Sequence, residues 1–125
     1  VRAETDQPTP YEQFIRLYAG EKYPECLEAF ERLSPTLQTN DNILFVKANA
    51  LLASGRAAEA AVLLDGILTR RQCAYLEQAP WYLALAALKT GDLPRARQRL
   101  QSLASDSKSP RRDDARRLLR QLKER

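Results

Sequence analysis

A short pattern of one small and one large residue recurs three times along this 125-residue chain, and it constrains the fold more than any other feature. In each copy the large residue follows the small one by four positions, which is the spacing of neighbouring side chains on one face of an α-helix. The copies are 34 and then 36 residues apart. This period is typical of helical repeat proteins, in which stacked helix pairs bury a core that no single pair can bury. The three pairs are Cys26 and Phe30, Ala60 and Leu64, and Ala96 and Leu100.

Apolar residues recur every three to four positions through most of the chain, and the composition is rich in Leu and Ala. Both features predict α-helices and no sheet. Residues 70–74 fit either a loop or an extension of the fifth helix, which begins near Gln78 or is kinked at Pro80. Residues 35–39 and 106–109 are predicted to be loops. The seven predicted helices span residues 10–19, 23–33, 40–54, 57–69, 76–89, 93–105 and 110–123.

Several helix ends carry recognisable signals in the sequence. Thr9 is predicted to cap the first helix, either Asn40 or Asp41 the third, and Ser109 the last, because short polar side chains accept hydrogen bonds from helix N-termini. Gly66 lies inside a predicted helix that it weakens. Its presence there predicts close packing against a neighbour.

The turns between paired helices repeat as well. Gly55 and Gly91 lie in two of them, whereas the first turn has Glu21 at the matching position and Gly20 one residue earlier. Together with the small and large positions, these turns resemble those of the tetratricopeptide repeat (TPR) family. The resemblance implies an all-α fold: a right-handed TPR-like superhelix of three helix pairs plus a C-terminal capping helix. The third copy matches best, with Trp81, Leu83, Ala84, Ala87, Gly91, Ala96 and Leu100.

The length of the chain suits one domain. Residues 1–9 are polar and lack an apolar period, so they are predicted to be a flexible lead-in. Residues 10–123 are predicted to form the TPR-like domain. Its repeats cover about residues 8–39, 40–74 and 75–108, and residues 110–123 form the cap.

Catalytic chemistry has few candidate residues in this chain. Histidine is absent and no glycine-rich phosphate loop is present. Cys26 and Cys73 are too far apart for a zinc-binding pattern, so neither a metal nor another cofactor is predicted. Cys26 is expected to be an inert core thiol, while Cys73 is expected to be more accessible. The sequence predicts that the protein is not an enzyme, and the alternative is a thiol enzyme that uses Cys73.

The resemblance implies a binding groove along the first helix of each pair, where a peptide or protein partner docks. It places no complete carboxylate clamp there, because Phe45 and Tyr82 replace the lysine and arginine of that clamp, although Asn49 is suitable. Trp81 either faces the groove or packs in the core beneath the last helix. The implied groove residues are Tyr11, Ile15, Tyr18, Phe45, Asn49, Leu52, Trp81, Tyr82, Leu85 and Lys89.

The net charge of +4 is concentrated in the last predicted helix. One alternative to the groove follows from this: the basic helix binds nucleic acid or another anionic partner. A separate alternative is that the domain self-associates into a homo-oligomer. Nucleic acid is the less favoured partner, because no aromatic side chain for base stacking is interleaved with the arginines.

The compartment is inferred from resemblance alone. Residues 79–119 resemble the C-terminal part of bacterial, notably Bacteroidetes, TPR proteins in which a membrane-spanning helix precedes the TPR domain. The chain begins at Val1 without Met, and we expect further residues upstream. The resemblance implies a membrane-anchored protein whose TPR domain lies on the periplasmic side, with a cytoplasmic location as the alternative.

Overall fold

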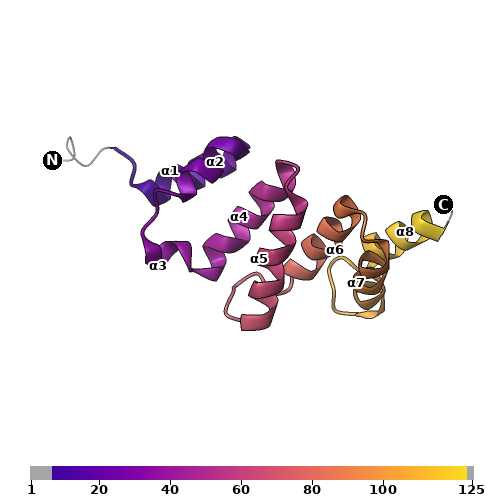
Figure 1. Cartoon of the computed structure of the whole chain (residues 1–125). Helices are drawn as coiled ribbons and strands as arrows, with labels where there is room; N and C mark the ends of the chain where they lie inside the picture. Colours follow the sequence, from indigo (N-terminus) through magenta and orange to yellow (C-terminus); the bar gives the residue numbers. More distant parts are fainter. Residues whose placement is uncertain (1–6, 124–125) are drawn as a thin grey trace.

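The computed structural model describes residues 7–123 as eight α-helices without a strand (Figure 1). The predicted all-α class is thereby confirmed, whereas residues 1–6 of the predicted lead-in lie outside the described part. The helices are α1 (Pro10–Ala19), α2 (Tyr23–Phe30), α3 (Pro35–Gln38), α4 (Asp41–Ala53), α5 (Ala57–Arg70), α6 (Ala79–Thr90), α7 (Leu93–Ser105) and α8 (Arg112–Lys123).

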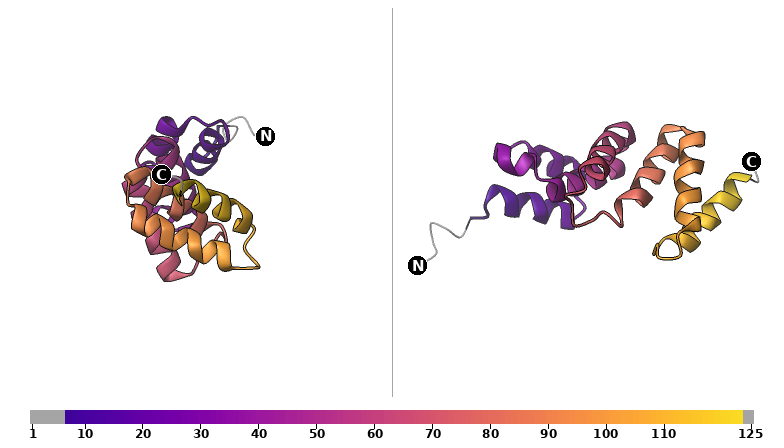
Figure 2. Two further views of the ribbon diagram at one scale, coloured as in Figure 1. Left: turned by 90° about the vertical axis from the view of Figure 1, so that its right-hand side faces the viewer. Right: turned by 90° about the horizontal axis from the view of Figure 1, so that it is seen from below.

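The helices stack one after another along an elongated molecule, with the two ends of the chain at opposite ends of the stack (Figures 1 and 2). Helices α1 and α2, α4 and α5, and α6 and α7 form three hairpins with short turns. α2 packs against α4, α5 against α6, and α7 against α8. Each hairpin therefore buries its apolar faces against its neighbours in the chain, as expected for repeats.

The three hairpin turns have the same backbone geometry. The residue that precedes each second helix donates its N–H to the carbonyl five residues earlier, a bond typical of the Schellman motif. These bonds join Lys22 to Leu17, Arg56 to Leu51 and Asp92 to Ala87, at 2.9, 2.8 and 2.9 Å. The residue before each donor has a left-handed backbone. These residues are Glu21, Gly55 and Gly91, with φ of 58°, 78° and 81°.

The core confirms the small and large positions of the repeat. Cys26, Ala60 and Ala96 are fully buried, and so are their large partners apart from slight exposure of Phe30. Burying one Leu or Phe side chain contributes about 1.5–3 kcal/mol. The apolar residues form three clusters, joined through α4 and α6, which each contribute to two of them.

Most predicted helix ends agree with the structure. Thr9 caps α1 in a capping box with Glu12. Of the two candidates for α4, Asn40 is the cap, because its Oδ1 accepts from the N–H groups of Asn42 and Ile43. Pro80 lies in the first turn of α6, so the helix starts near Gln78 and no kink is needed.

Two predicted boundaries were wrong. The predicted loop 35–39 contains the short helix α3, because Ser34 accepts from the Leu37 N–H and Pro35 supplies a helical φ. α2 ends at Phe30 and not at residue 33, although Leu33 is still buried. The first hairpin thus has a shorter second helix than the other two.

The predicted start of the last helix was also wrong. α8 begins at Arg112, two residues after the predicted start at Pro110. Ser109 accepts a hydrogen bond from the Arg111 N–H at 3.1 Å, and so it orders the turn before the helix. The helix then follows with Asp113 and Asp114 in its first turn, where carboxylates interact favourably with the positive end of the helix dipole.

Candidate functional site

One surface hollow lies between the first helices of the three hairpins. It has a volume of about 280 Å³ and is lined from α1, α4 and α6, with Tyr23 added from the start of α2. Six of the ten predicted groove residues line this hollow, which brings together side chains 71 positions apart in the sequence. These six residues are Tyr18, Asn49, Leu52, Tyr82, Leu85 and Lys89.

Tyr23 and Ala53 also line the hollow but were not among the predicted residues. Tyr23 is the first residue of α2, and its ring meets that of Tyr18 edge to face at 6.0 Å. The tight turn after α1 folds the chain back on itself and brings the two rings together. The position of Tyr23 directly after that turn is the only signal in the sequence that could have indicated it.

Phe45 lies beneath the hollow and does not line it. Its buried ring stacks on Tyr75 at 4.7 Å and meets Tyr82 edge to face at 5.7 Å. Such aromatic pairs add about 0.5–1.5 kcal/mol beyond the area that they bury. Phe45 therefore positions Tyr82, which does line the hollow, and a direct contact of Phe45 with a partner is not supported by its burial.

Trp81 is part of the core at the C-terminal end. Only 8% of its surface is exposed, and it belongs to the cluster formed with Leu100, Leu103, Ala115 and Leu122 of α7 and α8. The guanidinium of Arg111 lies over its ring at 5.0 Å from the ring centroid. Of the two placements predicted for Trp81, the core beneath the last helix is the one observed.

The first two predicted groove residues of α1 also lie away from the hollow. Tyr11 is 43% exposed near the start of the helix. Ile15 is half-buried and packs against the first apolar cluster, which includes Phe14 and Cys26. Only the last turn of α1, with Tyr18, reaches the hollow.

The hollow carries polar groups of three kinds. The Oδ1 atom of Asn49 is buried and has no hydrogen-bond partner among residues 7–123, and such an unsatisfied acceptor is costly. Burial raises the pKa of the Tyr18 hydroxyl, an effect that the neighbouring Asn49 side chain opposes. Lys89 is exposed at the edge and has no ion pair within the described range. The hollow thus offers apolar walls and one cation at its edge, while Oδ1 of Asn49 lies below its surface.

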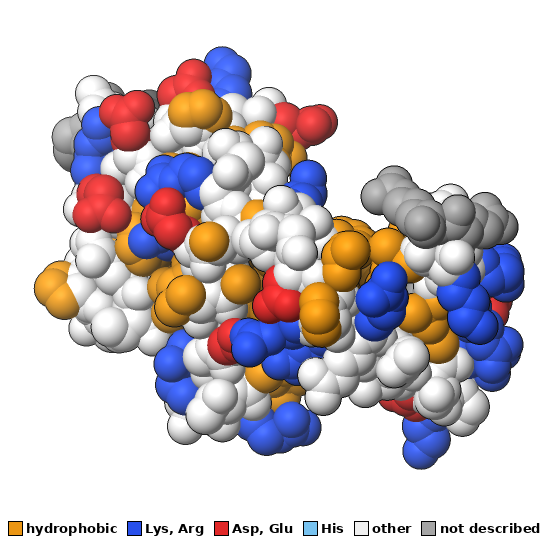
Figure 3. All heavy atoms as spheres, turned by 45° about the vertical axis from the view of Figure 1, so that its right-hand side comes forward, with side chains coloured by type: hydrophobic (Ala, Val, Ile, Leu, Met, Phe, Trp, Pro, Cys, Tyr) orange, Lys and Arg blue, Asp and Glu red, His pale blue; other side chains and the backbone are white. Residues whose placement is uncertain are grey.

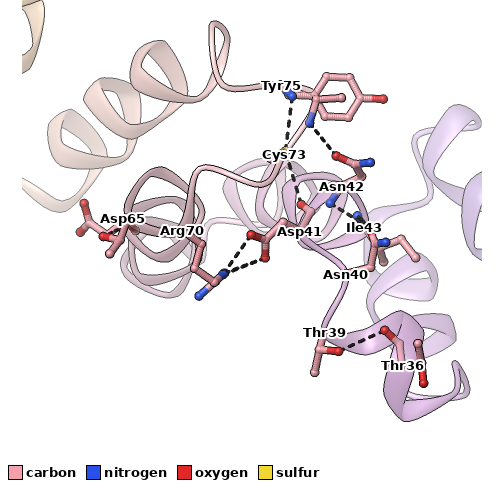
Figure 4. Close-up of polar contacts among 12 residues, drawn as sticks. Thr36, Thr39, Asn40, Asp41, Asn42, Ile43, Asp65, Arg70, Cys73 and Tyr75 are labelled. Carbon is pink, nitrogen blue, oxygen red and sulfur yellow. Dashed lines mark hydrogen bonds and ion pairs between the residues drawn. The ribbon is translucent and has the colours of Figure 1, made fainter.

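A network of polar contacts holds the segment that carries Tyr75 against α4 (Figure 4). The buried carboxylate of Asp41 accepts from Nε and Nη2 of Arg70 at 2.8–3.0 Å. This hydrogen bond raises the pKa of Arg70. The Ala74 N–H donates to Oδ1 of Asn42 at 2.8 Å. We call these contacts the Asp41–Arg70 clamp, and it fixes the support on which Phe45 and Tyr82 rest.

Two predictions about residues near the clamp, Cys73 and Gly66, were wrong. Cys73 was expected to be accessible but is buried, because its segment folds over the start of α4 and its thiol contacts the Asp41 carbonyl at 3.6 Å. Gly66 was expected to pack closely against a neighbour. A Cβ atom there would lie 3.0 Å from Nη1 of Arg70, so the glycine leaves space for the arginine of its own helix.

The other cysteine behaves as expected from the sequence. Cys26 is fully buried, and its thiol donates to the Phe14 carbonyl at 3.6 Å. Burial raises the pKa of this thiol to about 11. Because the thiolate is the reactive form, Cys26 is inert near neutral pH.

Among residues 7–123, no three His, Cys, Asp or Glu side chains lie close enough to hold a metal ion together. None of the helices in that range is long and apolar enough to span a membrane.

The described residues define an all-α protein with a helical-repeat-like organisation. Its repeated unit is the hairpin with a left-handed residue in the turn and a buried small residue four positions before a large one. Comparison of the chain with protein-family models, with curated proteins and with solved structures gives no match.

Proposed function

We propose that this chain is a TPR-like interaction module that binds a segment of a partner protein in the hollow between α1, α4 and α6. In this proposal the three hairpins form a right-handed superhelix whose inner face is lined by the first helix of each hairpin. The observation that carries it is the convergence of side chains from all three first helices on one hollow. Residues in matching repeat positions, such as Asn49 and Leu85, lie side by side there because the hairpins repeat.

The size of the hollow favours a protein segment as the ligand. Pockets for drug-sized molecules usually measure about 300–1,000 Å³. A hollow of about 280 Å³ is smaller and open, and it accommodates one or two side chains of a partner. A peptide that also extends along the neighbouring helices would bury more surface than the hollow alone provides.

The polar groups define what such a segment should present. Leu52 and Leu85 supply an apolar floor, and the tyrosines supply walls that combine an apolar ring with a hydroxyl. The exposed Lys89 ammonium at the edge favours an acidic group on the partner. These groups are typical of a binding surface, so the proposed role is binding without catalysis.

Selection of peptides from a displayed random library tests this proposal. Peptides selected on the wild-type chain should bind at least about tenfold more weakly to Tyr18→Ala and Lys89→Ala variants, since hot-spot truncations cost about 2 kcal/mol or more. Val62→Ala is the matched control, because Val62 is 71% exposed on α5 and does not line the hollow. Unchanged affinity in both hollow variants would refute the proposal.

A further inference from the structure

Three exposed glutamates follow one another along α2 and the residue that caps its C-terminal end. Glu25, Glu28 and Glu31 are three residues apart, which places them side by side on the helix surface. All three are exposed, and none has an ion pair among residues 7–123. Like charges at this spacing repel and weaken the helix. We call this row the acidic ridge, and it favours contact with cations.

Two hollows with apolar floors border the acidic ridge. One has a volume of about 220 Å³ and includes Leu17, and the other has about 470 Å³ and includes Leu27 and Leu51. Glu28 lines both, so the ridge runs between them. Arginine and lysine side chains bury an apolar stem while their charge stays near solvent. Hollows of this kind beside carboxylates therefore suit the side chains of a basic helix.

Three cations also border these hollows. Arg32 lines the smaller one, and Lys47 and Arg56 line the larger. The Lys47 ammonium lies over the Phe30 ring at 4.1 Å, and Arg56 is bound to Glu59 at 2.8 Å. Arg56 is thus paired with Glu59, whereas Lys47 and Arg32 border the ridge and offset part of its charge. None of the three ridge glutamates forms an ion pair with them among residues 7–123, so their carboxylates remain available to a partner.

The opposite end of the molecule carries the complementary charge. Arg112, Arg116, Arg120 and Lys123 follow one another along α8 at intervals of four, four and three residues, which places them on one face. Arg116, Arg120 and Lys123 are exposed and make no ion pair within residues 7–123. Lysine and arginine side chains gather at this end of the surface (Figure 3). We call this face the basic stripe.

We propose that the basic stripe of α8 docks on the acidic ridge of a second copy of this chain. The two faces lie at opposite ends of the elongated stack, so they cannot meet within one molecule (Figures 1 and 2). The ridge from Glu25 to Glu31 spans about 9 Å at the helical rise, and the part of the stripe without ion pairs, from Arg116 to Lys123, spans about 10 Å. Two copies that meet in this way form either a closed antiparallel dimer or a longer head-to-tail array.

The physical nature of the contact determines its strength. Its charges are exposed, so each ion pair contributes little and is screened by salt. The Debye length falls from about 30 Å at 0.01 M salt to about 10 Å at 0.1 M. Association is therefore weak and strongly dependent on salt, unlike an association that is driven by apolar surface.

Analytical ultracentrifugation of the full chain with paired charge reversals tests the proposal. The variants are Glu25→Lys/Glu28→Lys on the ridge and Arg116→Glu/Arg120→Glu on the stripe. Wild-type mass should increase with concentration at about 20 mM NaCl and return to that of a monomer at about 300 mM. Each variant alone should associate at least about tenfold more weakly than wild type. The paired control is Glu77→Lys with Arg97→Glu, two exposed positions away from both faces, and it should behave as wild type.

The decisive sample is an equimolar mixture of the two variants at low salt. Each ridge in the mixture then finds a stripe of opposite charge on the other variant, so association should return to the wild-type level. A wild-type chain that stays monomeric at low salt overturns the proposal, as does a mixture that fails to associate. Salt-sensitive binding of duplex DNA through α8 by a monomeric chain would instead assign the basic stripe to nucleic acid.

Discussion

The first and third hairpins occupy equivalent places in the repeat but are built from different residues. Their turns share one hydrogen-bond pattern, and each buries a small residue at the start of its second helix. Glu21 nevertheless stands where the third hairpin has Gly91, and Cys26 stands where it has Ala96. The backbone of the repeat thus tolerates substitution at its most restrictive positions. As a result, the first hairpin has a non-glycine residue with a left-handed backbone at Glu21 and a buried thiol at Cys26, and the third hairpin has neither.

The surroundings of these two hairpins differ as well. α8 packs on the third hairpin and completes its core, whereas α1 and α2 have no such covering helix among residues 7–123. The links to the middle hairpin also differ. Gln38 in the first linker donates to the carbonyls of Phe30, Glu31 and Leu33. The second linker is instead held against α4, where the Ala74 N–H donates to Oδ1 of Asn42 and the Cys73 thiol contacts the Asp41 carbonyl. The third hairpin is therefore more firmly built into the stack than the first.

The largest predicted effect contrasts Trp81 with Tyr11, which occupy the same repeat position. Trp81→Ala should lower the free energy of unfolding by about 3–4 kcal/mol, because it leaves a cavity between α6, α7 and α8. Tyr11→Ala should change it by less than about 0.5 kcal/mol, because the side chain is largely exposed. Urea unfolding followed by circular dichroism measures both. Equal losses in the two variants would contradict the unequal burial of these two side chains.

The next effect concerns the ion pair between Arg70 and Asp41, which joins α5 to α4 just before the second linker. Arg70→Ala should cost about 2–3 kcal/mol, since it leaves the Asp41 carboxylate, whose side chain is 4% exposed, without its partner. Asp41→Ala should cost less, because the arginine side chain is 47% exposed and regains water. The matched change in the first linker, Gln38→Ala, should cost about 1 kcal/mol. Denaturant titrations of the three variants measure these losses. A larger loss for Gln38→Ala than for Arg70→Ala would show that the buried Asp41 carboxylate does not depend on its ion pair.

A third prediction concerns the pH dependence of stability, to which Cys26 of the first hairpin contributes and the equivalent Ala96 of the third does not. Burial raises the pKa of the Cys26 thiol from 9.0 to about 11 in the folded chain. The stabilisation is complete below pH 9, and it is lost as pH rises to about 11, because the unfolded chain releases the thiol proton first. Two pKa units correspond to a loss of about 2–3 kcal/mol.

The control for this titration is Cys26→Ala, which gives the first hairpin the residue type of the third. Other groups titrate in the same interval in both proteins, so the quantity to measure is the difference between their unfolding free energies at pH 8 and at pH 11. That difference should shift against the wild type as pH rises. A parallel decline of both proteins would show that the thiol of Cys26 does not couple to folding.

The hairpins and their core were predictable from the sequence because they depend on local features. The spacing of Cys26 and Phe30, and its repetition along the chain, determined which helix faces are buried. Caps such as Thr9 and Asn40 act within three residues of their position, so their role could be recognised directly. The left-handed backbone of Glu21 was not predicted, although this residue aligns with the glycines of the other two turns.

The rest depends on contacts between distant parts of the chain. Arg70 meets Asp41 across 29 positions, and no local pattern indicates this pair. Cys73 is buried against the Asp41 carbonyl across 32 positions, and the burial of Trp81 follows from the docking of α8. For the hollow, the repeat predicted the central residues well. Whether Tyr11 and Ile15 also reach the hollow depends on how the hairpins pack over α1, which is a tertiary property.

The smallest predicted effect tests the equivalence of the first and third turns directly. Glu21 has a φ of 58°, a conformation that costs a non-glycine residue about 1 kcal/mol or more, whereas glycine adopts it freely. Glu21→Gly should therefore stabilise the chain by about 0.5–1 kcal/mol, after the greater freedom of glycine in the unfolded chain is subtracted.

The reverse substitution provides the matched test of the same conformational effect. A Cβ atom at Gly91 would meet no atom within 4 Å, so Gly91→Ala introduces backbone strain without a clash. It should destabilise the chain by about 1 kcal/mol, opposite in sign to Glu21→Gly. Thermal and denaturant unfolding of both variants measure the pair. If Glu21→Gly destabilises the chain, the carboxylate of Glu21 makes a favourable interaction that outweighs its strained backbone, and the two turns are then equivalent in geometry but not in energy.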